Sequence, residues 1–441
     1  MADVVLIYPY FYTHARDAML FHPLGIAQLT ALLRRRGLDV SVVDCTFRSR
    51  DHVLVDIEEN PPRIVGVYAM VSISANACAM AGDLRNHLPD VALVCGGPLP
   101  TVRPEQFAGV FDLVFRGEAD RSFPRFCRDY VASGLHLRDF LSSRKSLACY
   151  PGLYGHEPDA GPVFQTPVKS SEAEDFNRLP IPDRTDYDHR RYQSFWMERG
   201  EVWPATIMTT YGCPYGCEFC SRPIFGRVFR RRNMGRIFEE VRTIKESGYN
   251  GLWIGDDCFT LDLEHVRAFC RRLIEEKVEM KWSCLSRVDT ISAEDVALMG
   301  RAGCWRVYLG LESGDNGVLK MMNKRATVEA ADRTVRLFSE TGIETSGFFM
   351  VGYPGETCES IEKTFAWSLS LPLDELSFSI PYPLPGTPLI ERVVGVNAAS
   401  DWTYENENQF VYESEFDADY LKRRIEETHA QFTAQRQSSR R

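Results

Sequence analysis

The stretch Cys213-Pro-Tyr-Gly-Cys217-Glu-Phe-Cys220 holds three cysteines at a C-x3-C-x2-C spacing. Thiolates are the usual protein ligands of iron–sulfur clusters, and a [4Fe–4S] cluster that only carries electrons takes four of them. Three thiolates therefore leave one iron open to another molecule. The spacing predicts a [4Fe–4S] cluster bound by Cys213, Cys217 and Cys220, with a vacant position for a further ligand.

A structural zinc ion is the alternative occupant of these cysteines. Zinc in structural sites takes four ligands, and the sequence offers no nearby histidine or fourth cysteine to complete the set. His189 and Cys258 would join such a site only through the fold. We therefore favour the cluster.

Length and composition limit the possible classes of protein. The chain has 441 residues, which exceeds one ordinary domain. Its net charge of −10 disfavours nucleic acid or an anionic membrane as a partner and would suit a cationic substrate. The N-terminus lacks a signal-peptide pattern, and no apolar run approaches the roughly 20 residues of a membrane-spanning helix. With 13 cysteines, most of them isolated in apolar stretches, we expect a cytoplasmic protein in a reducing environment that also preserves a cluster.

Two regions alternate short apolar strands with amphipathic helices. The first, residues 1–133, has strand patterns at 4–8, 39–43, 64–68, 92–95 and 113–115. This alternation predicts a doubly wound parallel α/β sheet, which binds ligands at the carboxyl ends of its strands. Residues 134–200 are rich in glycine and proline and predict a linker, with room for a hairpin.

The second region, residues 201–390, repeats the alternation six times. Its strand patterns lie at 205–209, 251–254, 281–284, 306–309, 345–351 and 375–379. Six β/α units predict a partial (β/α)6 barrel, whose chemistry belongs at the carboxyl ends of the strands. The cysteine motif follows the first of these strands. Residues 391–441 predict a polar tail with a helix at 421–434.

From these motifs the chain resembles a radical SAM enzyme with an N-terminal B12-binding-type domain, over residues 1 to about 390. The resemblance implies that the open iron holds the amino and carboxylate groups of S-adenosylmethionine (SAM). One electron from the cluster then releases a 5′-deoxyadenosyl radical. A flavodoxin- or ferredoxin-type protein is the implied electron donor.

The SAM contacts that the resemblance implies follow successive barrel strands; they are Phe219, Asp256, Asp257, Arg287, Glu312 and Gly352. A carboxylate suits the SAM ammonium group, and an arginine suits its carboxylate. Structural roles remain open for several of them. Phe219 would also serve as a core aromatic shielding the cluster, the aspartates as a helix N-cap, and Gly352 as part of a tight turn.

The first region shares Pro23-Leu24-Gly25, Cys95-Gly96-Gly97-Pro98 and Arg116-Gly117-Glu118 with the B12-binding type. It lacks a D-x-H-x-x-G motif, so no histidine is predicted to bind cobalt. Leu99 stands where the family commonly has histidine, which removes a polar contact from the loop expected to hold the nucleotide tail. The sequence leaves open whether cobalamin binds or whether the domain is only a scaffold.

Two reactions compete, and the sequence most resembles the first, that of the radical SAM diol dehydratase of apramycin biosynthesis. It predicts hydrogen abstraction from a paromamine-like aminosugar with loss of the adjacent hydroxyl as water, followed by a separate reductase. Tyr215, Glu344 and Asp374 are the predicted catalytic residues, with Glu375 and Tyr382 as further candidates. The alternative is a cobalamin-dependent C-methyltransferase of a natural product or lipid. A non-catalytic cobalamin or cluster sensor is a third hypothesis, which would not need the SAM-site motifs.

Overall fold

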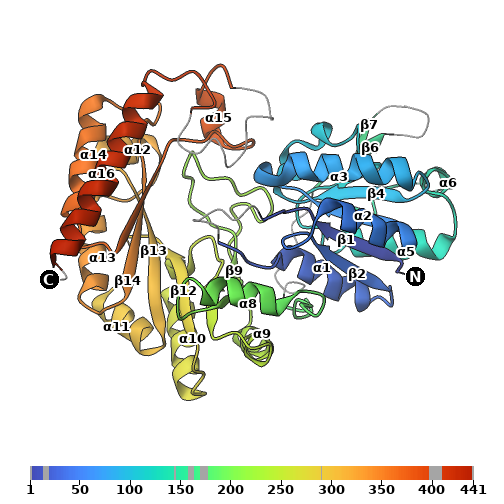
Figure 1. Ribbon diagram of the computed structural model, residues 1–441, viewed down its shortest axis with the longest axis horizontal. Helices are drawn as coiled ribbons and strands as arrows, with labels where there is room; N and C mark the ends of the chain where they lie inside the picture. The colour runs from blue at the N-terminus through green and yellow to red at the C-terminus, as the bar shows by residue number, and fades with distance from the viewer. Residues whose placement is uncertain are drawn as a thin grey trace. The chain divides into compact units, whose positions relative to one another are not determined.

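The computed structural model describes residues 2–12, 19–143, 146–156, 163–168, 177–289, 291–396 and 410–439 (Figure 1). The chain divides into two units. The first comprises Met1–Trp203, Arg222–Gly226 and Gly235–Ser247, and the second comprises Pro204–Ser221, Arg227–Met234 and Gly248–Arg441. Among the described residues, no helix is both long and apolar enough to span a membrane.

A seven-stranded sheet of order β2-β1-β3-β4-β5-β6-β7 forms the centre of the first unit. Its strands are β1 (Val4–Tyr8), β2 (Val40–Asp44), β3 (Ile64–Tyr68), β4 (Ala92–Gly96), β5 (Leu113–Phe115), β6 (Leu153–His156) and β7 (Val163–Gln165). The first five are parallel and the last two pair antiparallel. The helices are α1 (Leu24–Arg34), α2 (Arg50–Glu59), α3 (Ser74–His87), α4 (Pro98–Val102), α5 (Ser122–Ser133) and α6 (Leu137–Ser143). The predicted doubly wound parallel sheet is confirmed.

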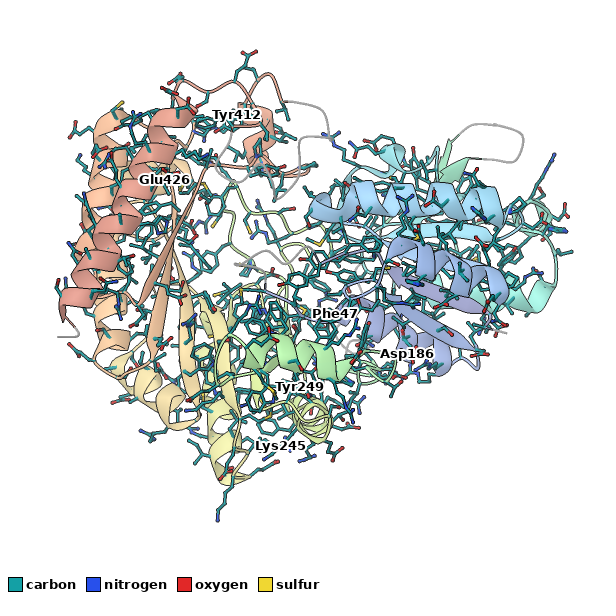
Figure 2. The ribbon with its side chains drawn as sticks, in the orientation of Figure 1. Phe47, Asp186, Lys245, Tyr249, Tyr412 and Glu426 are labelled. Carbon is teal, nitrogen blue, oxygen red and sulfur yellow. The ribbon has the colours of Figure 1, made fainter. Side chains whose placement is uncertain are left out.

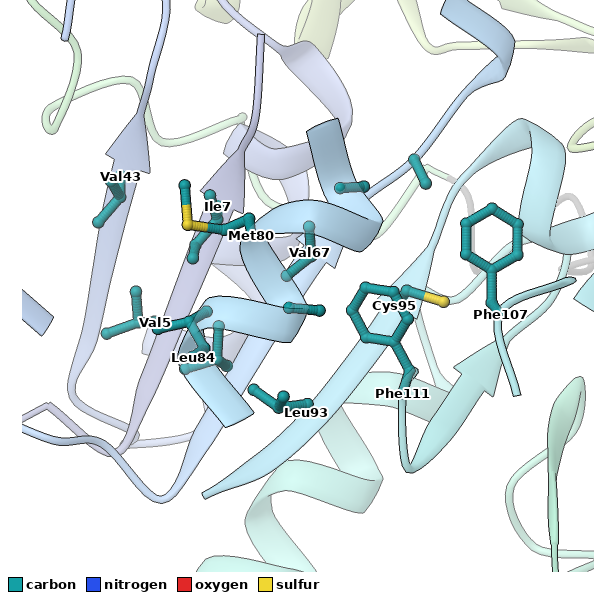
Figure 3. Packing of buried hydrophobic residues seen from close by; sticks show 14 of the residues in the cluster. Val5, Ile7, Val43, Val67, Met80, Leu84, Leu93, Cys95, Phe107 and Phe111 are labelled. Atoms are coloured by element: carbon teal, nitrogen blue, oxygen red, sulfur yellow. The ribbon is translucent and has the colours of Figure 1, made fainter. Parts of the chain in front are cut away.

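Both faces of this sheet are buried. Val5 and Ile7 of β1 belong to one apolar cluster, which Figure 3 shows, and Val4 and Leu6 belong to a second cluster on the other face. A strand buried on both faces needs apolar side chains at every position. This explains the continuous apolar run Val4-Val5-Leu6-Ile7.

The segment predicted as a linker contains ordered elements of the first unit. Besides the β6–β7 hairpin it forms α8 (His189–Met197). Tyr192 of α8 donates a 2.6 Å hydrogen bond to Asp44 at the end of β2, and the Trp196 indole donates one of 2.8 Å to the Leu20 carbonyl. Phe47, labelled in Figure 2, stacks edge-on against Tyr192. Helix α8 therefore packs beside the carboxyl end of β2.

The second unit contains a parallel six-stranded sheet of order β15-β14-β13-β12-β11-β8. Its strands are β8 (Pro204–Ile207), β11 (Gly251–Ile254), β12 (Lys281–Ser286), β13 (Cys304–Glu312), β14 (Glu344–Met350) and β15 (Glu375–Ser379). A short pair, β9 (Thr210–Tyr211) and β10 (Arg230–Arg231), follows β8. The helices are α10 (Leu263–Glu275), α11 (Ala293–Arg301), α12 (Asn316–Met321), α13 (Val328–Ser339), α14 (Cys358–Ser370), α15 (Pro388–Arg392) and α16 (Ala418–Ser439), while α9 (Met234–Glu246) is counted mostly with the first unit. The predicted six-unit partial barrel is confirmed.

The two faces of this second sheet differ in character. Val307, Leu309 and Phe349 point to the helix-covered face, where Phe349 contacts Trp367 of α14. Residues that alternate with them point to the opposite, concave face, and Tyr308 and Phe348 are two of these. Because paired residues of parallel strands share a face, the register fixes which side chains line that concave side.

Candidate functional site

The cysteine motif lies in the loop after β8 and β9, at the carboxyl edge of the barrel sheet. Cys213 and Cys217 are 8% and 7% exposed, and Cys220 is half-buried. All thirteen cysteines lie in the described parts of the chain, and none forms a disulfide. This is the edge at which barrel enzymes carry their chemistry.

The loop is fixed from one side by the turn that ends α12. Asn323 has a φ of 51°, in the left-handed region that asparagine tolerates, and its side-chain amide donates a 2.8 Å hydrogen bond to the Gly216 carbonyl. A Cβ atom on Gly216 would lie 2.9 Å from that amide nitrogen. A side chain at position 216 would therefore displace the Asn323 amide from this contact.

Arg287 directly follows β12 and contacts the cysteine loop. Its Nε and Nη2 atoms bind the two carboxylate oxygens of Asp289 at 3.1 and 3.0 Å, and Nη2 also donates to the Lys324 carbonyl at 2.6 Å. The guanidinium carbon lies 3.6 Å from the centre of the Tyr215 ring, and Nη1 is 4.0 Å from the Cys217 sulfur. In this arrangement Asp289 occupies the side of the Arg287 guanidinium group that the sequence predicts to bind the SAM carboxylate.

Glu312 ends β13 with a φ of 63°, beside an irregularity in the pairing of β13 with β14. Its carboxylate accepts a 2.6 Å hydrogen bond from the Lys324 ammonium group, and both residues are buried. A Cβ atom on Gly310 would lie 2.7 Å from both groups, so a larger residue there would displace the Glu312–Lys324 pair. Sequence reasoning missed Lys324, because only the turn after α12 brings it back to β13.

The two aspartates after β11 differ in environment. Asp256 is fully buried and accepts hydrogen bonds from the Thr209 amide and hydroxyl, both 2.6 Å, and from the Thr210 hydroxyl at 2.8 Å. Burial raises the pKa of Asp256 to about 6. Its carboxylate thus ties β11 to the end of β8, just before the cluster loop. Asp257 is exposed, which makes it the better candidate for the SAM ammonium group.

The N-cap alternative does not apply to Asp256. The short 3-10 helix at Phe259–Leu261 has no side-chain cap, and α10 is capped by Asp262, which accepts from the His265 amide at 3.1 Å.

Gly352 and Phe219 take part in packing. Gly352 has a φ of 82°, and a Cβ atom there would lie 2.7 Å from Leu421 and 3.0 Å from Phe410. The turn itself is held by Glu356, whose carboxylate accepts a 2.7 Å hydrogen bond from the Tyr353 amide. Phe219 packs against a buried cluster of Val318, Met322, Met350, Tyr353 and Leu389. These contacts favour the tight-turn and shielding-aromatic roles, and contact with SAM stays a prediction.

Two of the predicted catalytic residues lie at the other edge of the sheet. Glu344 starts β14 and binds Arg306 at 2.6 Å. Asp374 precedes β15 and accepts from the Thr345 amide at 2.9 Å and from Arg436 at 2.6 Å. Residues that begin or precede parallel strands lie at the amino edge, so the structure does not bring Glu344 or Asp374 to the cysteines. Of the predicted catalytic residues, only Tyr215 lies in the cluster loop.

The three cysteines supply thiolates, the usual protein ligands of an iron–sulfur cluster. In the described parts of the chain, no group of three His, Cys, Asp or Glu side chains is placed to hold a single metal ion. Arg287, 4.0 Å from Cys217, would offset part of the negative charge.

In the first unit, the strand order 2-1-3-4-5 places the expected ligand crevice at the carboxyl ends of β1 and β3. The space that a Cβ atom on Gly97 would need is taken by the Ala69 carbonyl, 2.3 Å away, whereas the start of α1 is open around Gly25. Leu99 is buried in the apolar core. This edge can therefore present backbone and open space to a cobalamin nucleotide tail, but Leu99 presents no polar group to it.

Comparison with known proteins identifies both regions. Residues 207–368 match the radical SAM superfamily, and residues 15–126 match the B12 binding domain. An uncharacterized methyltransferase of Pyrococcus horikoshii is 29% identical over 386 residues, covering 85% of this chain and 79% of the relative. The anaerobic magnesium-protoporphyrin IX monomethyl ester cyclase of Rubrivivax gelatinosus is 27% identical over 400 residues, covering 88% of this chain and 70% of the relative.

Among solved structures, the radical S-adenosylmethionine methyltransferase TsrM of Kitasatospora setae, with cobalamin and a [4Fe–4S] cluster bound, superposes with a TM-score of 0.74. The identity is 20%, and the alignment covers 90% of this chain and 79% of that one. At this identity the likeness shows the fold. Residues 207–368 thus match a radical SAM domain and residues 15–126 match a B12 binding domain, and the former implies a [4Fe–4S] cluster and SAM as cofactors.

Proposed function

We propose that this chain, which combines a radical SAM domain with a B12 binding domain, is a cobalamin-dependent radical SAM methyltransferase acting on a small molecule. The single observation that carries the proposal is the presence of both domains in one chain. The relative from Pyrococcus horikoshii and the structural neighbour TsrM add support, since both are named as methyltransferases. One relative is a cyclase, so relatives of this chain include an enzyme whose name is not that of a methyltransferase.

In the proposed enzyme, Cys213, Cys217 and Cys220 hold the cluster and leave one iron for SAM. Asp257 binds the SAM ammonium group, and the Glu312–Lys324 pair borders the same edge. When bound, cobalamin would accept a methyl group from one SAM molecule, and the cluster would supply the electron that cleaves another. The Arg287 guanidinium lies over the Tyr215 ring within the cluster loop.

The concave face of the barrel sheet supports a substrate site below this edge. Trp253 packs edge-on against Tyr308 with ring centres 5.1 Å apart, and Tyr308 stacks on Phe348 at 5.7 Å. The register places small serines beside this aromatic row, since Trp253 pairs with Ser283, Tyr308 with Ser346 and Phe348 with Ser377. Stacked rings flanked by hydroxyl groups suit a substrate with an apolar face and polar substituents.

Dehydration of an aminosugar remains the less supported alternative. Neither relative described above carries a dehydratase name, and two of the three residues predicted to catalyse dehydration lie at the amino edge. The aminosugar, the separate reductase and the identity of the electron donor remain proposals that belong to that alternative or to the enzyme class.

The test begins with protein purified without oxygen and reconstituted with iron and sulfide. One half is loaded with hydroxocobalamin and freed of excess, and the other half is left without it. Both receive a strong one-electron reductant and SAM, and S-adenosylhomocysteine and 5′-deoxyadenosine are quantified. A parallel incubation adds paromamine, the probe for the alternative.

The proposal expects bound cobalamin and S-adenosylhomocysteine that forms only in the loaded sample. A protein that binds no cobalamin and converts paromamine to a product lighter by one water would replace the methyltransferase with the dehydratase. 5′-Deoxyadenosine from the loaded sample without any S-adenosylhomocysteine would also overturn methyl transfer.

A further inference from the structure

Glu218 lies between two of the cluster cysteines, Cys217 and Cys220. Its side chain contacts segments that lie far from this motif in the sequence. Its carboxylate oxygen Oε2 accepts a 2.5 Å hydrogen bond from Arg392 Nη1 and one of 3.2 Å from the Tyr353 hydroxyl. Arg392 is the last residue of α15, and Tyr353 lies in the turn after β14. A residue inside the cluster loop is therefore joined to two segments more than 130 positions away.

The backbone of Glu218 is also held on both sides. Its amide donates to the Met322 carbonyl at 3.0 Å, and its carbonyl accepts from the Leu389 amide at 3.1 Å. The first contact reaches the end of α12 and the second reaches the start of α15. Four hydrogen bonds thus converge on one residue of the loop.

Arg392 is itself oriented by several acceptors. Its guanidinium donates to the carbonyls of Met321 and Pro354 at 3.5 and 3.4 Å, and its central carbon lies 5.6 Å from the Tyr353 ring centre. An isolated ion pair of this exposure, 36% for Arg392 and 26% for Glu218, stabilises a protein little. Arg392 is more constrained in geometry than a cation in such a pair, because further acceptors hold it and its partner lies in an anchored loop.

The charges of the cluster, Glu218 and Arg392 explain why this contact matters. A cluster bound by three thiolates is anionic, and the Glu218 carboxylate is a further anion one residue from Cys217. Like charges in proximity repel. Arg392 neutralises the carboxylate and keeps it turned toward α15.

We propose that Glu218 and Arg392 form a latch that positions the Cys217–Cys220 segment and slows loss of the cluster. Glu218 is a positioning residue in this role, since it acts through its hydrogen bonds to Arg392, Tyr353, Met322 and Leu389. The latch rests on the cluster site and not on the methyl-transfer reaction, so it stands or falls independently of the substrate and of cobalamin.

The test compares Arg392→Met with Arg424→Met in the full chain. Arg424 pairs with Glu362 at 2.7 Å, with side chains 23% and 46% exposed, and it joins α16 to α14. Each variant is reconstituted without oxygen, and cluster loss to an iron(II) chelator is followed by the decay of the brown absorbance. The electron paramagnetic resonance spectrum of the reduced cluster is recorded with and without SAM.

The latch predicts that Arg392→Met loses its cluster about fivefold faster than wild type, which corresponds to about 1 kcal/mol of loop-opening free energy. Arg424→Met should match wild type, and Arg392→Lys should recover part of the difference. The spectrum of the SAM-bound cluster should change in Arg392→Met alone, because the loop and the ligands it carries shift.

Glu218→Gln provides a second route if Arg392→Met folds poorly, because it keeps an acceptor for Tyr353 and removes only the charge. It should also lose the cluster faster than wild type, and combining it with Arg392→Met should add little to either single change. Equal decay rates for Arg392→Met, Glu218→Gln and Arg424→Met would overturn the latch, as would fully additive effects of the two latch variants.

Discussion

The Lys324 ammonium group lies 2.6 Å from Glu312 Oε1, and both side chains are buried at the carboxyl end of β13. The carboxylate is the one that the sequence assigned to SAM binding, and its lysine partner comes twelve positions later in the chain. The pair also frames the space above Gly310. Removing either partner alone would leave a buried charge without compensation.

We therefore expect Lys324→Met to lower the unfolding free energy of the second unit by about 3 kcal/mol. Lys320→Met is the matched control, since Lys320 is exposed at the end of α12, and its effect should stay below about 0.5 kcal/mol. Adding Glu312→Gln to Lys324→Met should restore much of the loss. Urea unfolding of wild type, of the three single variants Lys324→Met, Glu312→Gln and Lys320→Met, and of the double variant measures this. A double variant as unstable as the sum of Lys324→Met and Glu312→Gln would argue against the pair.

Replacing Cys217 and replacing Cys258 should have different effects on the cluster. Cys217→Ala should abolish the brown absorbance after reconstitution, because two thiolates do not retain the cluster. Cys258 is buried near the same edge, with its sulfur 3.9 Å from the Thr260 hydroxyl, and Cys258→Ala should keep both the absorbance and the SAM-induced spectral change. Loss of the cluster in Cys258→Ala would make it a fourth ligand and remove the open iron.

Glu356 should make stability fall as pH rises. Burial, opposed in part by the hydrogen bond from Tyr353, raises the pKa of Glu356 from 4.5 to about 7, and Asp315 adds repulsion. The folded protein thus keeps a proton that the unfolded chain loses between about pH 4.5 and 7, so this stabilising contribution is lost across that window. Tyr412 also lies within electrostatic reach of Glu356.

The variant Glu356→Gln has no such titration and can still accept from the Tyr353 amide. Relative to wild type, it should gain on the order of 2–3 kcal/mol of stability between pH 5 and pH 8. Unfolding of the cluster-free protein at the two pH values measures the gain. An unchanged difference between the variant and wild type would show that Glu356 is ionised at both.

Asp374→Asn should leave SAM cleavage unchanged. The carboxylate lies at the amino edge and binds Arg436 of α16, so its loss should destabilise the docking of α16 by about 1 kcal/mol. Quantifying 5′-deoxyadenosine from the reconstituted variant checks this. A large fall in its rate, with the cluster intact, would restore the catalytic role first predicted for Asp374.

The short apolar runs that alternate with amphipathic segments predicted the strands well, because parallel strands buried between layers need continuous apolar runs. β1, β3, β5, β11 and β15 have the predicted limits. β13 is longer than predicted, since Gly310 and Glu312 extend it through an irregular pairing that no apolar pattern marks. Helix α8 was missed because the glycine- and proline-rich sequence around it indicated a linker.

The site was only partly predictable for a different reason. The cysteines and the residues at the carboxyl ends of β11, β12 and β13 follow from the order of motifs along the chain. Lys324 and Arg392 do not, because a left-handed turn and a long-range contact bring them to the loop. Glu344 was placed at the wrong edge, because a residue that begins a parallel strand lies at the opposite edge of the sheet from one that follows the strand.

The most direct test of the account is the yield of S-adenosylhomocysteine as a function of bound cobalamin per chain, measured with reductant and SAM in excess. A methyltransferase of this class predicts that the yield rises in proportion to the bound cobalamin and is absent without it. A yield independent of cobalamin, with 5′-deoxyadenosine as the main product at every loading, would contradict methyl transfer by this protein.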